Sequence, residues 1–174
     1  MSSFSVVRRG TRLDPVVHAL RSVHLHDGYP SAWPQDPVAW LNPAGTLDAW
    51  VATDDSDVLG HALLVRGEQI HHGAEIERAA GVPVTAIGGL SRLFVVPAAR
   101  GTGAAASLLD QVESAAAERG IQLALDVVDD GGPAVRLYER RGWKRVAVGP
   151  AAWLRPDGVR PRSAAYLLPR ARSS

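Results

Sequence analysis

The chain has 174 residues, a formal net charge of +1, 46% hydrophobic residues and no cysteine. This length fits one ordinary globular domain, and the lack of cysteine excludes disulfides, thiolate metal ligands and a cysteine nucleophile. The near-zero charge argues against a nucleic-acid-binding domain, and without an apolar leader or an 18-residue apolar run we expect a cytoplasmic protein with no membrane segment.

The N-terminal part predicts a strand, a helix and a proline-rich segment. A short strand begins at Phe4, and Asp14 followed by Pro15 is typical of a helix start, with Asp14 as the cap. One face of this helix carries apolar side chains at helical spacing: Val16, Val17, Leu20 and Val23. The stretch 24–45 holds four prolines and two tryptophans, and we expect a short helix near 37–41 within it.

Two apolar runs, 49–53 and 58–65, flank an Asp/Ser-rich turn and predict a β-hairpin. An excursion over 67–86 with a short helix near 74–80 leads to a long strand over 88–96. A helix then runs to Gly120, a strand covers 121–128, a helix starts at Pro133, and strands near 143–148 and 164–168 close the chain. We therefore expect a single α/β domain over 1–174, with helices flanking a mixed central sheet.

A glycine-rich turn between the strand at 88–96 and the next helix is the most informative feature. It reads Arg100, Gly101, Thr102, Gly103, Ala104, Ala105 and Ala106. Glycines let successive backbone N–H groups converge on one point, and the helix N-terminus adds about half a positive charge there. A phosphate or pyrophosphate is the natural ligand, with Arg100 as a charged partner. A plain tight turn into a capped helix is the alternative.

Two other phosphate-binding motifs fit this turn less well. A P-loop requires Gly-Lys-Ser/Thr, and no lysine lies nearby. The dinucleotide fingerprint G-x-G-x-x-A is satisfied by Gly101–Ala106, with Asp126 placed as a ribose-binding acid. However, four residues separate the strand from the first glycine, and only 48 residues follow Asp126. That is too short for the rest of a doubly wound sheet.

Two segments resemble the GNAT acetyltransferase superfamily. Val95-Val-Pro-Ala-Ala-Arg100-Gly-Thr-Gly-Ala-Ala105 is similar to its coenzyme A pyrophosphate motif, Arg/Gln-x-x-Gly-x-Gly/Ala after a strand ending in Val-x-Pro. Ala134-Val-Arg-Leu-Tyr-Glu-Arg-Arg-Gly-Trp143 is similar to the later segment A-x-x-L-Y-x-x-x-G-F/W. Gly131 stands where many relatives carry an asparagine that helps to hold pantetheine, so Asp129 or Asp130 is expected to take over that task.

The resemblance implies that the fourth and fifth strands splay apart and that acetyl-coenzyme A binds as co-substrate, without a metal. The backbone of Leu93, Phe94 and Val95 would hold the pantetheine arm, with the Val95 N–H polarising the thioester carbonyl. Arg100–Ala106 would hold the pyrophosphate. Tyr138 would protonate the departing thiolate, unless it is only a core aromatic. The implied reaction is acetyl transfer to a small-molecule or peptide amine; the alternative is a non-catalytic acyl-coenzyme A binding or sensing module. Dimers are common in the family.

Other functional residues follow only partly from the sequence. The rings Tyr29, Trp33 and Trp40 suit the wall of an acceptor pocket, although tryptophans that merely cover the core look the same. The general base is undetermined; the candidates are His24, His61, Glu68, Arg92 and Asp126, the last also fitting a plain cap at a strand end. His71 and His72 are interpreted as a solvated surface pair rather than a metal site.

Overall fold

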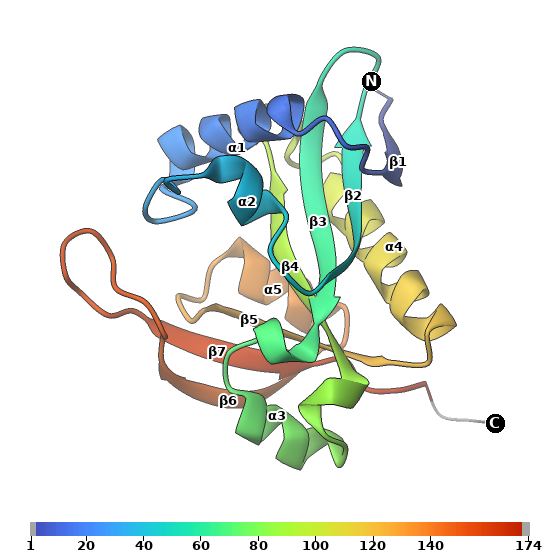
Figure 1. The fold of residues 1–174 in the computed structure, drawn as a ribbon, viewed down its shortest axis with the longest axis vertical. Coiled ribbons are helices and arrows are strands. Elements are labelled where there is room, and N and C mark those ends of the chain that lie inside the picture. The colour runs from blue at the N-terminus through green and yellow to red at the C-terminus, as the bar shows by residue number, and fades with distance from the viewer. Residues whose placement is uncertain (1–2, 172–174) are drawn as a thin grey trace. The chain divides into compact units, whose positions relative to one another are not determined.

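The computed structural model describes residues 3–171, whose strands form a seven-stranded mixed sheet with helices packed against it (Figure 1). The strand order is β1-β2-β3-β4-β5-β7-β6. Two units make up the chain: Met1–Val65 with Leu90–Ala115, and Arg66–Gly89 with Ala116–Ser174. Strand β4 contributes to both. The predicted α/β class and mixed sheet are confirmed.

The first unit contains the predicted hairpin. Its elements are β1 (Ser5–Arg8), α1 (Asp14–Asp27), α2 (Pro37–Leu41), β2 (Thr46–Thr53), β3 (Val58–Arg66), the end of β4 (Ile87–Val95), the 3₁₀ turn η3 (Pro97–Ala99) and α4 (Ala104–Glu118). Strand β2 pairs antiparallel with both β1 and β3. The Asp54 carboxylate accepts hydrogen bonds from the Ser56 and Asp57 N–H groups at 2.9 and 2.8 Å, which closes the β2–β3 turn.

Helices cover both faces of the strands of the first unit. Figure 1 shows α1 and α2 together on one side of β2 and β3 and α4 on the other. The α1 stripe (Val16, Ala19, Leu20 and Val23) is buried against Leu41, Val51 and Phe94. On the other face, a Cβ at Gly60 would lie 2.9 Å from the Phe94 carbonyl oxygen and 3.0 Å from Leu108 Cδ1. Glycine at position 60 therefore allows β3 to approach its neighbours closely.

The start of α1 differs from the prediction. The N-cap is Leu13, and no side chain caps the helix. The Val17 N–H already donates to the Leu13 carbonyl at 2.8 Å, so the first turn closes one residue earlier than expected. Asp14 is therefore a first-turn residue, where its charge still stabilises the helix dipole.

The second unit packs two helices against three C-terminal strands. Its elements are η1 (Gly67–Gln69), α3 (Gly73–Ala80), η2 (Val84–Ala86), the start of β4, β5 (Gln122–Val128), α5 (Pro133–Arg140), β6 (Lys144–Pro150) and β7 (Arg162–Leu167). Strand β7 lies between β5 and β6 and is antiparallel to both. The parallel register of β4 with β5 covers Ile87–Gly89 and Gln122–Ala124, while both strands continue beyond it. Figure 1 shows α3 and α5 on opposite sides of these strands.

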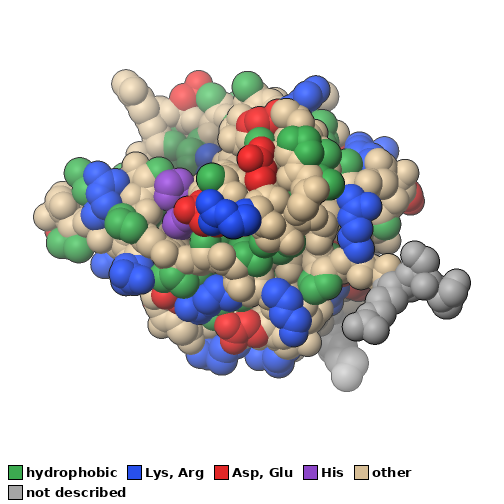
Figure 2. Space-filling view, turned by 90° about the horizontal axis from the view of Figure 1, so that it is seen from below, with side chains coloured by type: hydrophobic (Ala, Val, Ile, Leu, Met, Phe, Trp, Pro, Cys, Tyr) green, Lys and Arg blue, Asp and Glu red, His purple; other side chains and the backbone are tan. Residues whose placement is uncertain are grey.

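The surface carries mixed charge. On the face drawn in Figure 2, basic side chains are spread among acidic and apolar ones. Among residues 3–171, none of the helices has the length and apolar content needed to cross a bilayer.

Candidate functional site

The turn from β4 into α4 has the backbone that the sequence predicted. Gly101 and Gly103 have φ angles of +75° and +88°, values that side chains with a Cβ rarely adopt. The first helical bond of α4 runs from the Ser107 N–H to the Gly103 carbonyl at 3.0 Å. A Cβ at either glycine would meet no atom within 4 Å, so these glycines serve the backbone path and leave open space beside it. This suits an anion at the N-terminus of a 15-residue helix.

Two side chains of the turn, Thr102 and Arg100, form hydrogen bonds with other residues of the first unit. The Thr102 hydroxyl donates to the Ala99 carbonyl at 2.5 Å. The Arg100 guanidinium pairs with the Asp27 carboxylate at the end of α1 and also donates to the Val95 carbonyl at 3.3 Å. The hydrogen bond from Arg100 lowers the pKa of Asp27 to about 2. Arg100 is therefore already paired with a carboxylate in this structure.

Strand β4 is distorted immediately before the predicted pantetheine segment. Arg92 has φ +51°, an uncommon value for a non-glycine residue that marks a local constraint. Phe94 is buried and stacks on His61 with ring centroids 5.3 Å apart, while Leu93 and Val95 are half-buried. The Val96 N–H donates to the Leu59 carbonyl at 2.8 Å, which fixes the end of β4 against β3.

The three predicted acceptor-binding rings form two groups in the first unit. Trp40 meets Tyr29 edge-on at 6.0 Å and lies beneath the Arg92 guanidinium, whose Cζ is 4.0 Å from the ring centroid. Trp33 instead contacts His24 at 5.4 Å and lies under Arg21 at 5.1 Å. Both tryptophans also pack against the α1 core, so the core-covering interpretation holds for part of each ring.

His61, one of the candidate bases, is fully buried with both ring nitrogens engaged. Its Nδ1 is 2.9 Å from the Arg92 carbonyl oxygen and its Nε2 is 2.9 Å from Arg9 Nη1. Since a carbonyl can only accept, Nδ1 carries the proton and Nε2 accepts from Arg9. Burial, with help from the Arg9 and Arg92 charges, lowers the pKa of His61 to about 3. This arrangement does not suit a general base.

Tyr138 lies in the second unit as one of three clustered rings. It is buried on α5, with centroids 5.9 Å from Trp143 and 6.4 Å from Tyr166. The Tyr166 hydroxyl donates to Glu139 at 2.8 Å and accepts from Arg145, which pairs with Asp129. The buried residues of α5 are Val135 and Tyr138, whereas Ala134 is exposed.

His71 and His72 are less exposed to solvent than the sequence analysis expected. Both are half-buried, their rings are 4.2 Å apart, and His72 Nε2 is 2.7 Å from the hydroxyl oxygen of the buried Ser163. The His71 backbone N–H donates to the Asp126 carboxylate at 3.2 Å. No group of three metal-ligating side chains occurs among residues 3–171.

The acidic residues that follow β5 bind nearby groups. Asp130 accepts from the Gly132 N–H at 2.8 Å, and Asp129 pairs with Arg145. The remaining base candidate, Glu68, is exposed in η1.

The family model described as the acetyltransferase (GNAT) family matches residues 17–143, well over half of the chain. The chain belongs to the GNAT acetyltransferase family. Uncharacterized N-acetyltransferases of Mycobacterium tuberculosis and Mycobacterium bovis are 32% identical to it over 94 residues, which is 53% of this chain and 50% of theirs. The chain thus matches about half the length of these curated relatives.

Solved GNAT structures share the fold over nearly the whole chain. The ribosomal-protein-S18-alanine N-acetyltransferase of Escherichia coli is 18% identical, with a TM-score of 0.71 over 99% of this chain and 97% of that one. An N-acetyltransferase of Staphylococcus aureus is 15% identical with a TM-score of 0.73, covering 96% and 98%. Arabidopsis thaliana NAA60, solved with acetyl-CoA, is 18% identical with a TM-score of 0.71, covering 95% and 97%.

In this GNAT chain, the first unit holds the glycine turn, the Leu93–Val95 segment and the three acceptor rings, while Tyr138 belongs to the second unit. Sequence reasoning missed Arg9 and Asp27. Neither residue belongs to a sequence motif, because each contacts a partner that lies far away in the chain. Arg9 is 52 residues from His61, and Asp27 is 73 residues from Arg100.

Proposed function

We propose that this GNAT-family protein binds acetyl-coenzyme A with its pyrophosphate at Arg100–Ala106 and transfers the acetyl group to an amine. The observation that carries the proposal is the pair of positive-φ glycines leading into α4, with open space beside both. Such a turn presents N–H groups and the helix dipole to an anion without a side chain in the way.

The β4 segment that follows Arg92 supports the second part of the proposal, which concerns the pantetheine arm. Leu93, Phe94 and Val95 would bind the pantetheine arm as an added strand, and the Val95 N–H would donate to the thioester oxygen as negative charge develops there. Burial of Phe94 against His61 keeps this segment rigid, which supports such a role.

The proposed reaction is direct. The amine nitrogen attacks the thioester carbon, the C–N bond forms, the C–S bond breaks and the nitrogen loses a proton to solvent, from which the Tyr138 hydroxyl is restored at the end of the cycle. Tyr138 would then give its hydroxyl proton to the leaving thiolate. Proton transfer from a tyrosine near pKa 10 to a thiolate near 8.5 is uphill by about 2 kcal/mol, which nearby dipoles can offset.

The test is thiol release from acetyl-coenzyme A across a panel of amines and N-terminal peptides, with calorimetric binding of acetyl-coenzyme A measured in parallel. We expect both binding and amine-dependent thiol release. Binding without release for any amine would favour a non-catalytic binding module, and loss of binding would contradict the proposed site.

A further inference from the structure

The buried His61 side chain, on β3, contacts two residues of β4 in the segment where that strand is distorted. Its Nδ1 carries the proton and donates to the Arg92 carbonyl oxygen at 2.9 Å. The same ring stacks on the Phe94 ring, with centroids 5.3 Å apart and an interplanar angle of 23°. His61 therefore holds β4 at two nearby positions, one through the backbone and one through a side chain.

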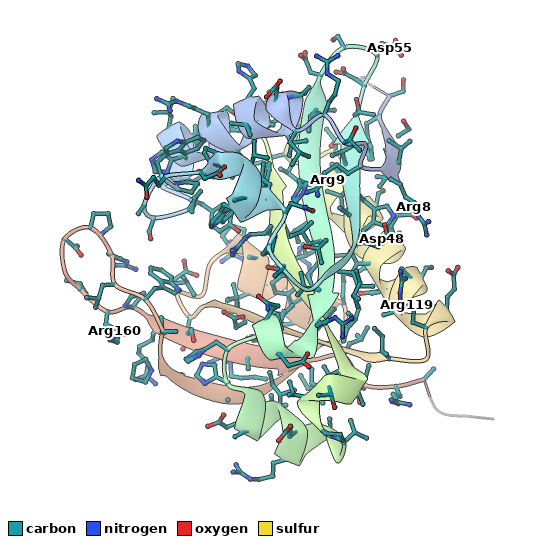
Figure 3. The ribbon with its side chains drawn as sticks, in the orientation of Figure 1. Arg8, Arg9, Asp48, Asp55, Arg119 and Arg160 are labelled. Carbon is teal, nitrogen blue, oxygen red and sulfur yellow. The ribbon has the colours of Figure 1, made fainter. Side chains whose placement is uncertain are left out.

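Arg9 fixes the other edge of the imidazole ring. Its Nη1 donates to His61 Nε2 at 2.9 Å, and the same guanidinium donates to the Leu41 carbonyl at 2.6 Å and to Asn42 Oδ1 at 2.7 Å. Figure 3 shows Arg9 on the side of α2. Because a guanidinium can only donate, Nε2 is the accepting nitrogen and Nδ1 keeps the proton that reaches β4. Burial, together with the Arg9 and Arg92 charges, lowers the pKa of His61, so the ring stays neutral.

The conformation of Arg92 decides how the rest of β4 presents its backbone. Its φ of +51° lies in the left-handed region, and a left-handed residue within a strand interrupts the ladder and redirects the peptide groups that follow. The residues that follow are Leu93, Phe94 and Val95, the segment proposed to bind the pantetheine arm. A residue with a Cβ keeps such a conformation only where its surroundings hold it. The His61 hydrogen bond and ring stack are contacts of this kind.

We propose that His61 is a positioning residue for the acetyl-coenzyme A site: its Nδ1–H holds Arg92 in the left-handed conformation, and this orients the Leu93–Val95 backbone toward the pantetheine arm. The inference rests on the proposed binding of acetyl-coenzyme A and adds to it a residue that acts only through β4. Without the donor, Arg92 can relax toward the extended conformation, which turns the N–H and C=O groups of residues 93–95 to new directions. The glycine turn at Arg100–Ala106 does not use this hydrogen bond, so pyrophosphate binding should be unaffected.

The tautomer of His61 is the first test, and it requires no ligand. We expect nitrogen NMR of the imidazole in the intact protein, near neutral pH, to show a neutral ring with its proton on Nδ1. A neutral ring with the proton on Nε2 would leave no donor for the Arg92 carbonyl and would overturn the inference, whatever the protein binds.

The second test separates the two parts of the coenzyme by calorimetry, with S-acetylpantetheine, which lacks the pyrophosphate, and ADP, which lacks the pantetheine arm. The amide of His61→Gln lies at the position of Nε2 and can still accept from Arg9, but no donor remains at the position of Nδ1. We expect this variant to bind S-acetylpantetheine about ten-fold more weakly than wild type and ADP equally well. His61→Asn places an amide N–H at the position of Nδ1 and should bring S-acetylpantetheine affinity back to within about three-fold of wild type.

Val16→Ala is the control for a general loss of packing, because Val16 is buried in the same unit but on α1. It should lower the melting temperature and leave both affinities unchanged. Equal weakening of both ligands in His61→Gln, wild-type affinity for both, or no recovery in His61→Asn would overturn the inference while wild-type binding of acetyl-coenzyme A stands. A wild-type protein that binds neither acetyl-coenzyme A nor its fragments would contradict the proposed function itself, and the inference with it.

Discussion

Two regions of the first unit are built in different ways. The turn from β4 into α4 uses backbone: Gly101 and Gly103 adopt positive φ, and the helix supplies the field. The cluster of Arg9, His61, Arg92 and Trp40 uses side chains that meet from four separate segments. A backbone site depends on conformations that few residues adopt, whereas a side-chain site depends on tertiary neighbours. The first kind can therefore be predicted from the sequence, whereas the second cannot, because it depends on which residues the fold brings together.

The largest effect of removing a single side-chain group is expected at Tyr138. Tyr138→Phe keeps the ring packed against Trp143 and should lower kcat about 10²-fold, because the variant has no proton for the thiolate. Coenzyme affinity and melting temperature should change little. The measurement is the turnover number under conditions where chemistry limits the rate.

Tyr166→Phe is the matched control, since it removes a hydroxyl from the same ring cluster. That hydroxyl binds Glu139 and Arg145, so its loss should reduce stability by about 1 kcal/mol while leaving kcat near the wild-type value. Equal loss of kcat in both variants, or full activity of Tyr138→Phe, would reduce Tyr138 to a packing role.

The lowered pKa of His61 predicts that the free energy of unfolding depends on pH. Its pKa is about 3 in the folded protein against an ordinary value near 6.5, so between these values the unfolded chain binds the extra proton. The contribution of neutral His61 is thus complete above pH 6.5 and is lost as the pH falls toward 3. From pH 6.5 to 5 this amounts to about 2 kcal/mol, at about 1.4 kcal/mol per pH unit.

Denaturant unfolding at several pH values measures this slope. His61→Gln keeps hydrogen-bonding groups but cannot titrate, so its unfolding free energy should depend less steeply on pH over this interval. A variant with the same slope as wild type would show that other groups, not His61, set the acid sensitivity.

Substitutions at Trp40 and Trp33 test the two aromatic groups separately. Trp40→Leu removes one wall of the proposed acceptor pocket, the ring that lies under Arg92, and should raise the KM for the acceptor about ten-fold, with little change for acetyl-coenzyme A. Trp33→Leu removes a similar ring that lies under Arg21 instead and should have a smaller effect on that KM. Steady-state kinetics with both substrates varied gives the comparison. Equal increases for acceptor and coenzyme would indicate general loss of packing.

Asp27 should have the smallest effect. Asp27→Asn removes the carboxylate partner of Arg100, which should tighten acetyl-coenzyme A binding a few-fold because more of the arginine charge becomes available. The pair is partly exposed, so its contribution to stability is about 0.5–1 kcal/mol. Since the pKa of Asp27 is depressed to about 2, that contribution is present above pH 4 and is lost as the pH falls toward 2. Weaker coenzyme binding by Asp27→Asn would show that Asp27 positions Arg100 instead.

The sequence predicted those parts of the molecule that local chemistry determines. The glycine turn was predictable because positive φ requires glycine at Gly101 and Gly103, and the Asp54 turn because its carboxylate binds the two N–H groups that follow. The α1 cap was misplaced by one residue, since no side chain marks the closing bond at Leu13.

Long-range partners could not be predicted. His72 was expected in solvent, yet its partner Ser163 lies 91 residues further along the chain. The Arg9–His61 bond likewise joins the end of β1 to β3, and no periodicity in either segment indicates it. These contacts depend on strand order, which the local pattern of residues does not contain.

Binding of acetyl-coenzyme A by Gly103→Ala tests the proposed pyrophosphate site most directly. Gly120→Ala is its control, because Gly120 also has positive φ (+67°) and open space around it but lies beyond the other end of α4. Both variants should lose about 1 kcal/mol of stability from backbone strain. Calorimetry should show that Gly103→Ala alone weakens acetyl-coenzyme A binding, by about ten-fold or more, and leaves binding of S-acetylpantetheine, which lacks the pyrophosphate, unchanged. Wild-type affinity for acetyl-coenzyme A in a folded Gly103→Ala protein, or an equal loss for both ligands, would contradict the pyrophosphate site at Arg100–Ala106.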